Sequence, residues 1–151
     1  METLTEKASK ELKELIIINN DRYEGYNKAA EETTDLDLKA LFHTYSLQSQ
    51  QFSNELQHLL PEHEYIPNPE ETTISGKLYR VFMDIKSTLE GNDRKGILSS
   101  CEFGEDQAKK AYNTILEDGE GMEYDVLEII RNQRFDLQSA HDKIKALRDS
   151  A

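Results

Sequence analysis

Residues 61–74 read PEHEYIPNPEETTI and contain all three prolines of the chain. Because a proline ring cannot continue a helix, this stretch separates two helical regions. A further amphipathic helix is predicted over residues 75–90, so the whole connection covers 61–92. A connection of about 30 residues can run the full length of a bundle, whereas antiparallel neighbours need only a short turn. The connection therefore predicts that the two long helices on either side of it are parallel.

Four long segments outside this connection carry apolar residues every three or four positions, as one buried helix face requires. The predicted helices cover residues 5–32, 35–60, 93–117 and 122–148. Thr5 is expected to cap the first helix, and Gly119 and Gly121 to form the turn before the last. Short turns make the first and second helices antiparallel, and likewise the third and fourth. The sequence therefore predicts one all-α domain over 1–151, a four-helix bundle with one long crossover, which is the connectivity of ferritin-like folds.

The chain is strongly acidic, with 18 Lys and Arg against 30 Asp and Glu and a net charge of −12. Such a surface repels phosphate backbones and anionic lipids, which disfavours binding to nucleic acids and membranes. The single cysteine, Cys101, forms no disulfide within the chain. The longest apolar run, residues 15–18, is far shorter than a bilayer span, and residues 1–14 show no signal-peptide pattern. We therefore expect a cytoplasmic protein.

Polar residues interrupt the predicted apolar faces near the middle of the helices: Asn19, Ser49, Glu105, Arg134 and His141. Because a buried carboxylate is costly without a partner, Glu105 should face a cation. In an antiparallel pair, residues equally distant from the turn lie at the same height. Counting from Gly119 places Glu105 level with Arg134. The same count places His141 level with Leu98. We therefore expect a Glu105–Arg134 ion pair within a hydrogen-bonded polar layer, with a metal site at Glu105 as the alternative.

Other candidate residues are weaker. Glu55 and His58 have the Glu-x-x-His spacing of di-metal bundles, but the neighbouring core residues turn both side chains toward the flank of the helix. His58 and His63 could form a surface pair, except that Pro61 interrupts the helix between them. Cys101 lies on an apolar face beside acidic residues, where a thiol ionises poorly, so core packing is expected. Four tyrosines at helical spacing are also expected in the core: Tyr23, Tyr26, Tyr45 and Tyr112.

Two stretches of the chain are distinctive: residues 23–33 read YEGYNKAAEET, and residues 92–106 read NDRKGILSSCEFGED. They resemble a family of uncharacterised bacterial four-helix-bundle proteins, classed as a domain of unknown function within the ferritin-like superfamily. The resemblance extends over essentially the whole chain, and residues 92–106 are its most specific part. It implies the ferritin-like topology and brings no established activity or substrate.

Catalytic ferritin-like proteins such as rubrerythrin hold two metal ions inside the bundle. When this chain is laid on their pattern, the ligand positions are occupied by Asn19, Ser49, Phe52, Glu105, Gln138 and His141. Only Glu105 and His141 retain a metal-binding side chain, and Phe52 replaces an imidazole. The resemblance therefore implies an incomplete di-metal centre and gives no support to oxidase, peroxidase or iron-storage activity.

The preferred interpretation is a non-enzymatic structural or interaction protein without a cofactor, stress-associated by analogy with ferritin-like proteins. Apolar residues in segment 75–90 favour a homodimer. The alternative is a degenerate metal-binding or redox bundle that holds iron, manganese or zinc. Its ligands would be Glu105 and His141, with Glu102 or Glu24 as further oxygen ligands. A ligand pocket between the helices, near the polar layer, is a third interpretation that no motif marks.

Overall fold

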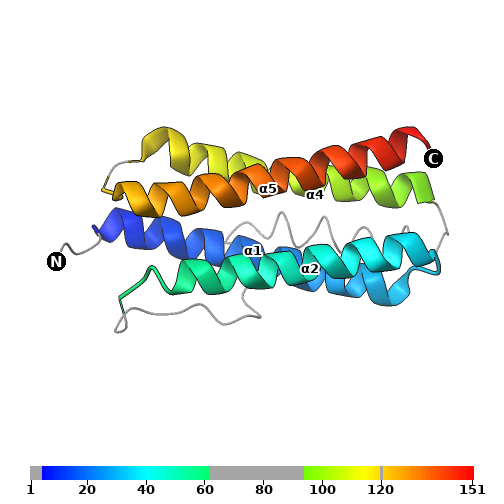
Figure 1. Cartoon of the computed structure of the whole chain (residues 1–151), viewed down its shortest axis with the longest axis horizontal. Helices are drawn as coiled ribbons and strands as arrows, with labels where there is room; N and C mark the ends of the chain where they lie inside the picture. The colour runs from blue at the N-terminus through cyan, green and yellow to red at the C-terminus, as the bar shows by residue number, and fades with distance from the viewer. Residues whose placement is uncertain (1–4, 62–93, 120) are drawn as a thin grey trace.

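The computed structural model describes residues 5–61, 94–119 and 121–151, which form an all-α four-helix bundle (Figure 1). Its helices are α1 (Glu6–Glu32), α2 (Leu36–Gln57), α4 (Arg94–Asp118) and α5 (Tyr124–Asp149). The predicted all-α bundle is confirmed, and each helix begins and ends within about three residues of its predicted bounds. The predicted crossover helix at 75–90, its apolar face and His63 lie outside the described residues.

The second helix, α2, ends at Gln57 rather than at residue 60, because the α-helical hydrogen-bond pattern changes before Pro61. The amides of Leu59 and Leu60 each donate, at 3.1 Å, to a carbonyl three residues back in the chain. This spacing is the 3₁₀-type pattern that often closes a helix. Pro61 has no amide hydrogen and cannot extend the helix further.

The helix directions agree with a bundle that has one long crossover. Figure 1 shows α2 and α4 running in one direction, and α1 and α5 running in the other. Arg94 at the start of α4 contacts Asp35 and Asp37, which flank the start of α2, at 3.1 and 2.6 Å. Lys7 near the start of α1 pairs with Asp118 at the end of α4. The expected parallel orientation of the helices that flank the long connection is therefore confirmed.

The core lies between two antiparallel pairs, α1 with α2 and α4 with α5, and α1 also packs against α4. Each helix contributes apolar side chains to one continuous buried cluster, and this burial is the main stabilising term at about 25 cal/mol per Å². On α4 every residue of the predicted face is buried: Leu98, Cys101, Glu105, Ala108, Tyr112 and Ile115. Within the described part of the chain, no helix is both long and apolar enough to cross a membrane.

Two of the predicted buried faces differ from the observed ones by one residue at particular positions. The buried face of α5 contains Gln133 and Ala140. Arg134 and His141, which were expected on that face, lie partly exposed beside it. On α1 the buried residue is Arg22, which is 0% exposed. Tyr23, which was expected in the core, is only partly buried. A helical face advances by either three or four residues, so the periodicity alone does not choose between neighbours at such positions.

The turn before α5 rests against the cap of α1. Thr5 caps α1 as expected, because its Oγ1 accepts a hydrogen bond from the Ala8 amide at 3.0 Å. Gly119 and Gly121 have φ values of 55° and 82°, which other residues rarely adopt. A Cβ on Gly121 would collide with the Thr5 side chain, whereas a Cβ on Gly119 would meet only ordinary contacts, the nearest at 3.5 Å.

We expect Gly121→Ala to lower the free energy of unfolding by about 2–3 kcal/mol, because it adds a clash with Thr5 to the cost of a positive φ. Gly119→Ala is the matched control, and it should lose about 1–2 kcal/mol from the backbone conformation alone. Urea unfolding followed by circular dichroism measures both losses. Equal losses in the two variants would show that contact with the α1 cap does not constrain this turn.

Candidate functional site

The interior of the bundle contains an ion pair between α1 and α4. Arg22 donates from Nε to Glu105 Oε1 at 2.7 Å and from Nη2 to Oε2 at 3.2 Å. Both residues are 0% exposed. The Tyr26 hydroxyl donates a further hydrogen bond to Oε1 at 2.8 Å. Since a bidentate arginine–carboxylate pair is the stronger form of such contacts, both oxygens of Glu105 are fully engaged.

Aromatic rings and a hydroxyl complete the surroundings of the Arg22 guanidinium. Its central carbon lies 5.2 Å from the ring centroid of Tyr26 and 5.4 Å from that of Tyr45. These distances allow cation–π attraction, which is strongest where water is excluded. The remaining nitrogen, Nη1, donates to Ser49 Oγ at 2.8 Å. The buried positive charge is therefore held by a carboxylate, two ring faces and a hydroxyl.

A chain of hydrogen bonds continues from Ser49 to all four described helices. Ser49 donates to Asn19 Oδ1 at 3.0 Å, and Asn19 Nδ2 donates to the Tyr112 hydroxyl at 2.8 Å. Tyr112 in turn donates to Gln133 Oε1 at 2.6 Å. Gln133 Nε2 ends the chain by donating to Glu55 Oε1 at 3.0 Å. The polar layer expected from the sequence is therefore present, and Gln133 is a member that the sequence did not indicate.

One end of the polar layer borders a cavity between α2 and α5. The cavity has a volume of about 480 Å³, and its lining includes Gln48, Phe52, Glu55 and Gln133. It lies at the last link of the hydrogen-bond chain, whereas the other end is closed around Arg22. A cavity near the polar layer agrees with the third interpretation of the sequence.

The expected Glu105–Arg134 ion pair is wrong. Arg134 instead donates from Nε to Asn113 Oδ1 at 2.8 Å, at the edge of the contact between α4 and α5. The expectation compared only the two helices joined by the short turn, but Glu105 faces the more distant segment α1. Its partner Arg22 lies 83 residues away in the sequence, so counting from a turn does not reach it.

The environment of the ion pair favours the neutral form of the groups next to it. Burial and then the charge of Glu105 raise the pKa of Tyr26 well above its usual value. The same two causes raise the pKa of Tyr45 to about 12 and that of the Cys101 thiol well above its usual value. Burial is the largest influence on the pKa of Arg22 and lowers it, but the charge of Glu105, the neighbouring Tyr26 and the hydrogen bond to Glu105 together outweigh burial, and the net shift is upward. Arg22 is therefore charged at neutral pH, and Cys101 is a neutral core thiol, as expected.

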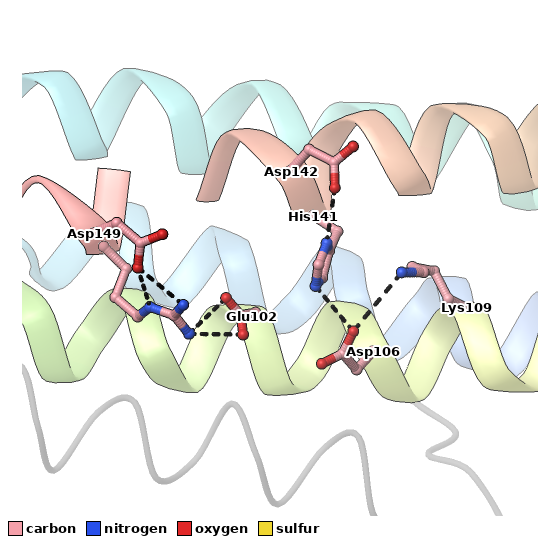
Figure 2. Close-up of polar contacts among 7 residues, drawn as sticks. Glu102, Asp106, Lys109, His141, Asp142 and Asp149 are labelled. Carbon is pink, nitrogen blue, oxygen red and sulfur yellow. Dashed lines mark hydrogen bonds and ion pairs between the residues drawn. The ribbon is translucent and has the colours of Figure 1, made fainter. Parts of the chain in front are cut away.

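A second group of polar side chains lies on the outer face of α4 and α5 (Figure 2). Glu102 and Asp106 are four residues apart on α4 and so share one face of that helix. His141 on α5 points toward them, and one ligand atom from each of the three lies within 4.8 Å of the others. His141 Nε2 lies 3.0 Å from Asp106 Oδ1, and Nδ1 lies 3.1 Å from Asp142 Oδ1. Two carboxylates and an imidazole are a metal-binding ligand set.

Two basic side chains border this second group. Arg148 Nη1 lies 2.7 and 2.6 Å from the two carboxylate oxygens of Glu102, and Arg148 Nη2 donates to Asp149 at 3.0 Å. Lys109 Nζ lies 3.8 Å from Asp106 Oδ1. A proton or a metal ion at this group would therefore compete with Arg148 and Lys109 for the carboxylates of Glu102 and Asp106.

The four predicted metal ligands do not lie in one place in the structure. Glu102 and His141 lie together, and Asp106 joins them, although the sequence reasoning did not single it out. Glu105 faces the interior, where Arg22 engages both of its oxygens. Glu24 lies on α1. Among residues 5–61, 94–119 and 121–151, the one group of three such side chains contains neither Glu105 nor Glu24.

The partner of His141 on α4 differs from the one that the sequence count predicted. The sequence count placed His141 level with Leu98, two turns from its observed partner. That count was wrong because the observed pairs, Asp106 with His141 and Asn113 with Arg134, are centred close to Tyr124, where α5 begins, and not at Gly119. The spacing of Glu102 and Asp106 on one helix face was the signal that could have identified the third ligand.

Comparison with known proteins adds a family but no activity. A search of the curated proteins finds no match to this chain. One family model matches residues 7–118, a range that contains Arg22, Glu102, Glu105 and Asp106 and ends with α4. That model covers well over half of the chain, so this protein belongs to the family described as a domain of unknown function, DUF2383.

Proposed function

We propose that this protein is a non-enzymatic helical bundle with a structural or interaction role, and that an internal ion pair takes the place of an internal metal centre. The observation that carries the proposal is the bidentate contact of Arg22 with Glu105. A metal ion at Glu105 would have to displace a guanidinium that is 0% exposed. The displaced charge would then lose its carboxylate inside the core, which is strongly unfavourable.

The resemblance to ferritin-like proteins gives this contact a particular meaning. Three of the positions that the resemblance assigns to metal ligands are Asn19, Ser49 and Glu105. Arg22 bonds directly to Ser49 and Glu105, and Ser49 bonds to Asn19. The guanidinium thus occupies the region that the resemblance assigns to the ions. Membership of the ferritin-like superfamily and a bacterial origin are part of this proposal, and the helix directions in Figure 1 support the former.

The cytoplasmic location and the homodimer remain predictions. The buried free thiol of Cys101 is compatible with a reducing compartment. The dimer was predicted from the apolar face of residues 75–90, which lies outside the described residues.

Metal analysis of a Glu105→Gln variant tests the proposal. We expect the wild-type chain and the variant, both expressed in iron-supplemented cells and shown to be folded, to contain the same amount of iron, manganese and zinc. Neither should accelerate the oxidation of added Fe²⁺ above buffer. Asn113→Ala, which alters a polar contact away from Glu105, is the control for nonspecific loss of metal. Stoichiometric metal that disappears only in Glu105→Gln would contradict the proposal.

A further inference from the structure

We propose that Glu102, Asp106 and His141 form a site for one divalent transition-metal cation on the outer face of α4 and α5, separate from the polar layer. The ligands would be one oxygen from each carboxylate and Nε2 of the imidazole. Two helices that pack against each other supply the three groups, so the site has a rigid base. Figure 2 shows the ring of His141 directed between Asp142 on its own helix and Asp106 on α4.

The distances between the ligand atoms require only small adjustments: the His141–Asp106 pair must separate slightly, and Glu102 must approach. The three ligand atoms lie within 4.8 Å of one another, and the Nε2–Oδ1 distance between His141 and Asp106 is already 3.0 Å. Ligand atoms on a tetrahedral zinc ion are about 3.4 Å apart, because the bonds are about 2.0–2.2 Å long. Rotation of the Glu102 side chain would supply the remaining movement without a shift of either helix.

The hydrogen-bond pattern of His141 points to a cation. Its two ring nitrogens lie 3.0 and 3.1 Å from carboxylate oxygens of Asp106 and Asp142. A neutral imidazole has one N–H, so it can donate to only one of these carboxylates and presents a lone pair to the other. With Nδ1 donating to Asp142, a metal ion between Nε2 and Asp106 would be held by the lone pair of the ring and the charge of the carboxylate.

Asp142 is placed to orient the imidazole for metal binding through Nε2. Metal-bound histidines usually donate their other N–H to a carboxylate or a carbonyl, which fixes the tautomer and the ring orientation. Asp142 Oδ1 lies 3.1 Å from Nδ1 of His141 and has this position. The side chain of His141 is only 13% exposed, so the ring is held partly out of water beside the carboxylates.

One carboxylate oxygen in the group lacks an aligned partner. Glu102 Oε2 is buried and accepts no hydrogen bond within the described structure, although Nη1 of Arg148 lies 2.6 Å away. Nη1 of Arg148 donates its hydrogen bond to Oε1 instead, at 2.7 Å. Arg148 is therefore the cation that a metal ion at Glu102 would have to displace.

Zinc titration of the chelator-treated full chain tests the site. At pH 7.5 we expect one zinc ion to bind by calorimetry, and Co²⁺ to give a saturable visible spectrum at the same stoichiometry. His141→Ala and Asp106→Asn should each weaken binding at least about tenfold. His58→Ala is the matched control, because His58 is an exposed histidine directly after α2 whose ring contacts the Asn54 carbonyl, and it should leave binding unchanged.

Removing Arg148, which competes with the metal ion for Glu102, should raise the zinc affinity rather than lower it. Arg148→Gln should strengthen zinc binding several-fold because it frees Glu102. Arg131→Gln, which removes an exposed arginine paired with Glu128 on α5, should have no effect. Circular dichroism and the metal-free Tm of each variant confirm that it is folded.

Three results would overturn this inference. The first is a wild-type chain that does not bind zinc saturably and whose His141 carries a proton on both ring nitrogens, as nitrogen NMR would show. A proton alone would then lie between His141 and the carboxylates. The second is zinc binding that survives His141→Ala and Asp106→Asn. The third is binding lost in His58→Ala. Loss of metal in Glu105→Gln would instead contradict the proposed interior ion pair, so the two proposals fail in different experiments.

Discussion

Replacing Arg22 by methionine is expected to lower the free energy of unfolding by about 3–5 kcal/mol, the usual cost of removing one partner of a buried ion pair. Methionine fills much of the same volume, so the loss reflects the charge left on Glu105 and not a cavity. Ser49 also loses the donor that contacts its hydroxyl at 2.8 Å. Chemical denaturation at pH 7 measures the effect.

Two further variants separate the buried pair from ordinary surface charge. Arg94→Met removes an arginine whose side chain is 34% exposed and whose partner Asp37 is 60% exposed, so it should lose at most about 1 kcal/mol. The double variant Arg22→Met/Glu105→Leu replaces both buried charges by apolar groups, and it should recover most of the stability lost in Arg22→Met. A double variant as unstable as the sum of its single variants would mean that the two residues do not interact.

The ion pair and the hydrogen-bond chain link the two antiparallel helix pairs to each other. The strongest packing is within the pairs α1–α2 and α4–α5. Arg22 on α1 bonds to Glu105 on α4 and to Ser49 on α2, and Gln133 on α5 bonds to Glu55 on α2. Because each of these groups needs its partner when buried, a shift of one pair along the other would leave several polar atoms unsatisfied. This requirement gives the layer a role in fixing the register of the two pairs.

The sequence was sufficient for the helices and their directions because both follow from local signals. Thr5, the glycines after Asp118 and the proline at 61 mark helix ends by backbone chemistry. The length of the connection then implied the parallel orientation of α2 and α4. The apolar face of α4 was predicted without error because each polar position in it, such as Glu105, is flanked by unambiguous core residues such as Cys101 and Ala108.

The identity of the buried cation could not be predicted from periodicity. Arginine is normally exposed, and at the step after Asn19 both Arg22 and Tyr23 fit a helical face. The apolar choice was preferred, and only the three-dimensional contact with Glu105 shows that Arg22 is buried. On α5 the same ambiguity favoured Arg134 over Gln133. A buried acid on one helix is a reason to look for an unpaired base on every other helix, and not only on the adjacent one.

The candidate metal ligands were predicted in part for a similar reason. His141 was named because it was expected on the apolar face of its helix, and Glu102 was named as a further oxygen ligand. Asp106 was missed because it follows Glu105, which drew attention to the interior. The contact between Asp106 and His141 depends on where α5 begins, and an error in the position of one turn shifts all the pairings between two helices.

Stability is expected to fall steeply as the pH rises above about 9, because folding raises the pKa of several buried groups that lose their protons more easily in the unfolded chain. These groups are Cys101, with an ordinary pKa of 9.0, and Tyr26, Tyr45 and Tyr112, with ordinary values of 10.0. For a raised pKa, the stabilising contribution is complete below the pKa of the unfolded chain and is lost as the pH rises toward the folded pKa. For Tyr45 the loss falls between pH 10 and about 12.

Each such group lowers the free energy of unfolding by up to about 1.4 kcal/mol per pH unit within its range, and the contributions of the four groups act in the same direction. We therefore expect cooperative unfolding between about pH 10 and 12, measurable by circular dichroism together with the absorbance of ionised tyrosine. Tyr45→Phe should reduce the slope of stability against pH between pH 10 and 12, because it removes one group that must ionise on unfolding. Tyr124→Phe, which alters a tyrosine that is 71% exposed, should leave the slope unchanged. Ionisation of all the tyrosines before the loss of helix would show that the buried hydroxyls are open to solvent in the folded protein, because exposed tyrosines such as Tyr124 ionise first in any case.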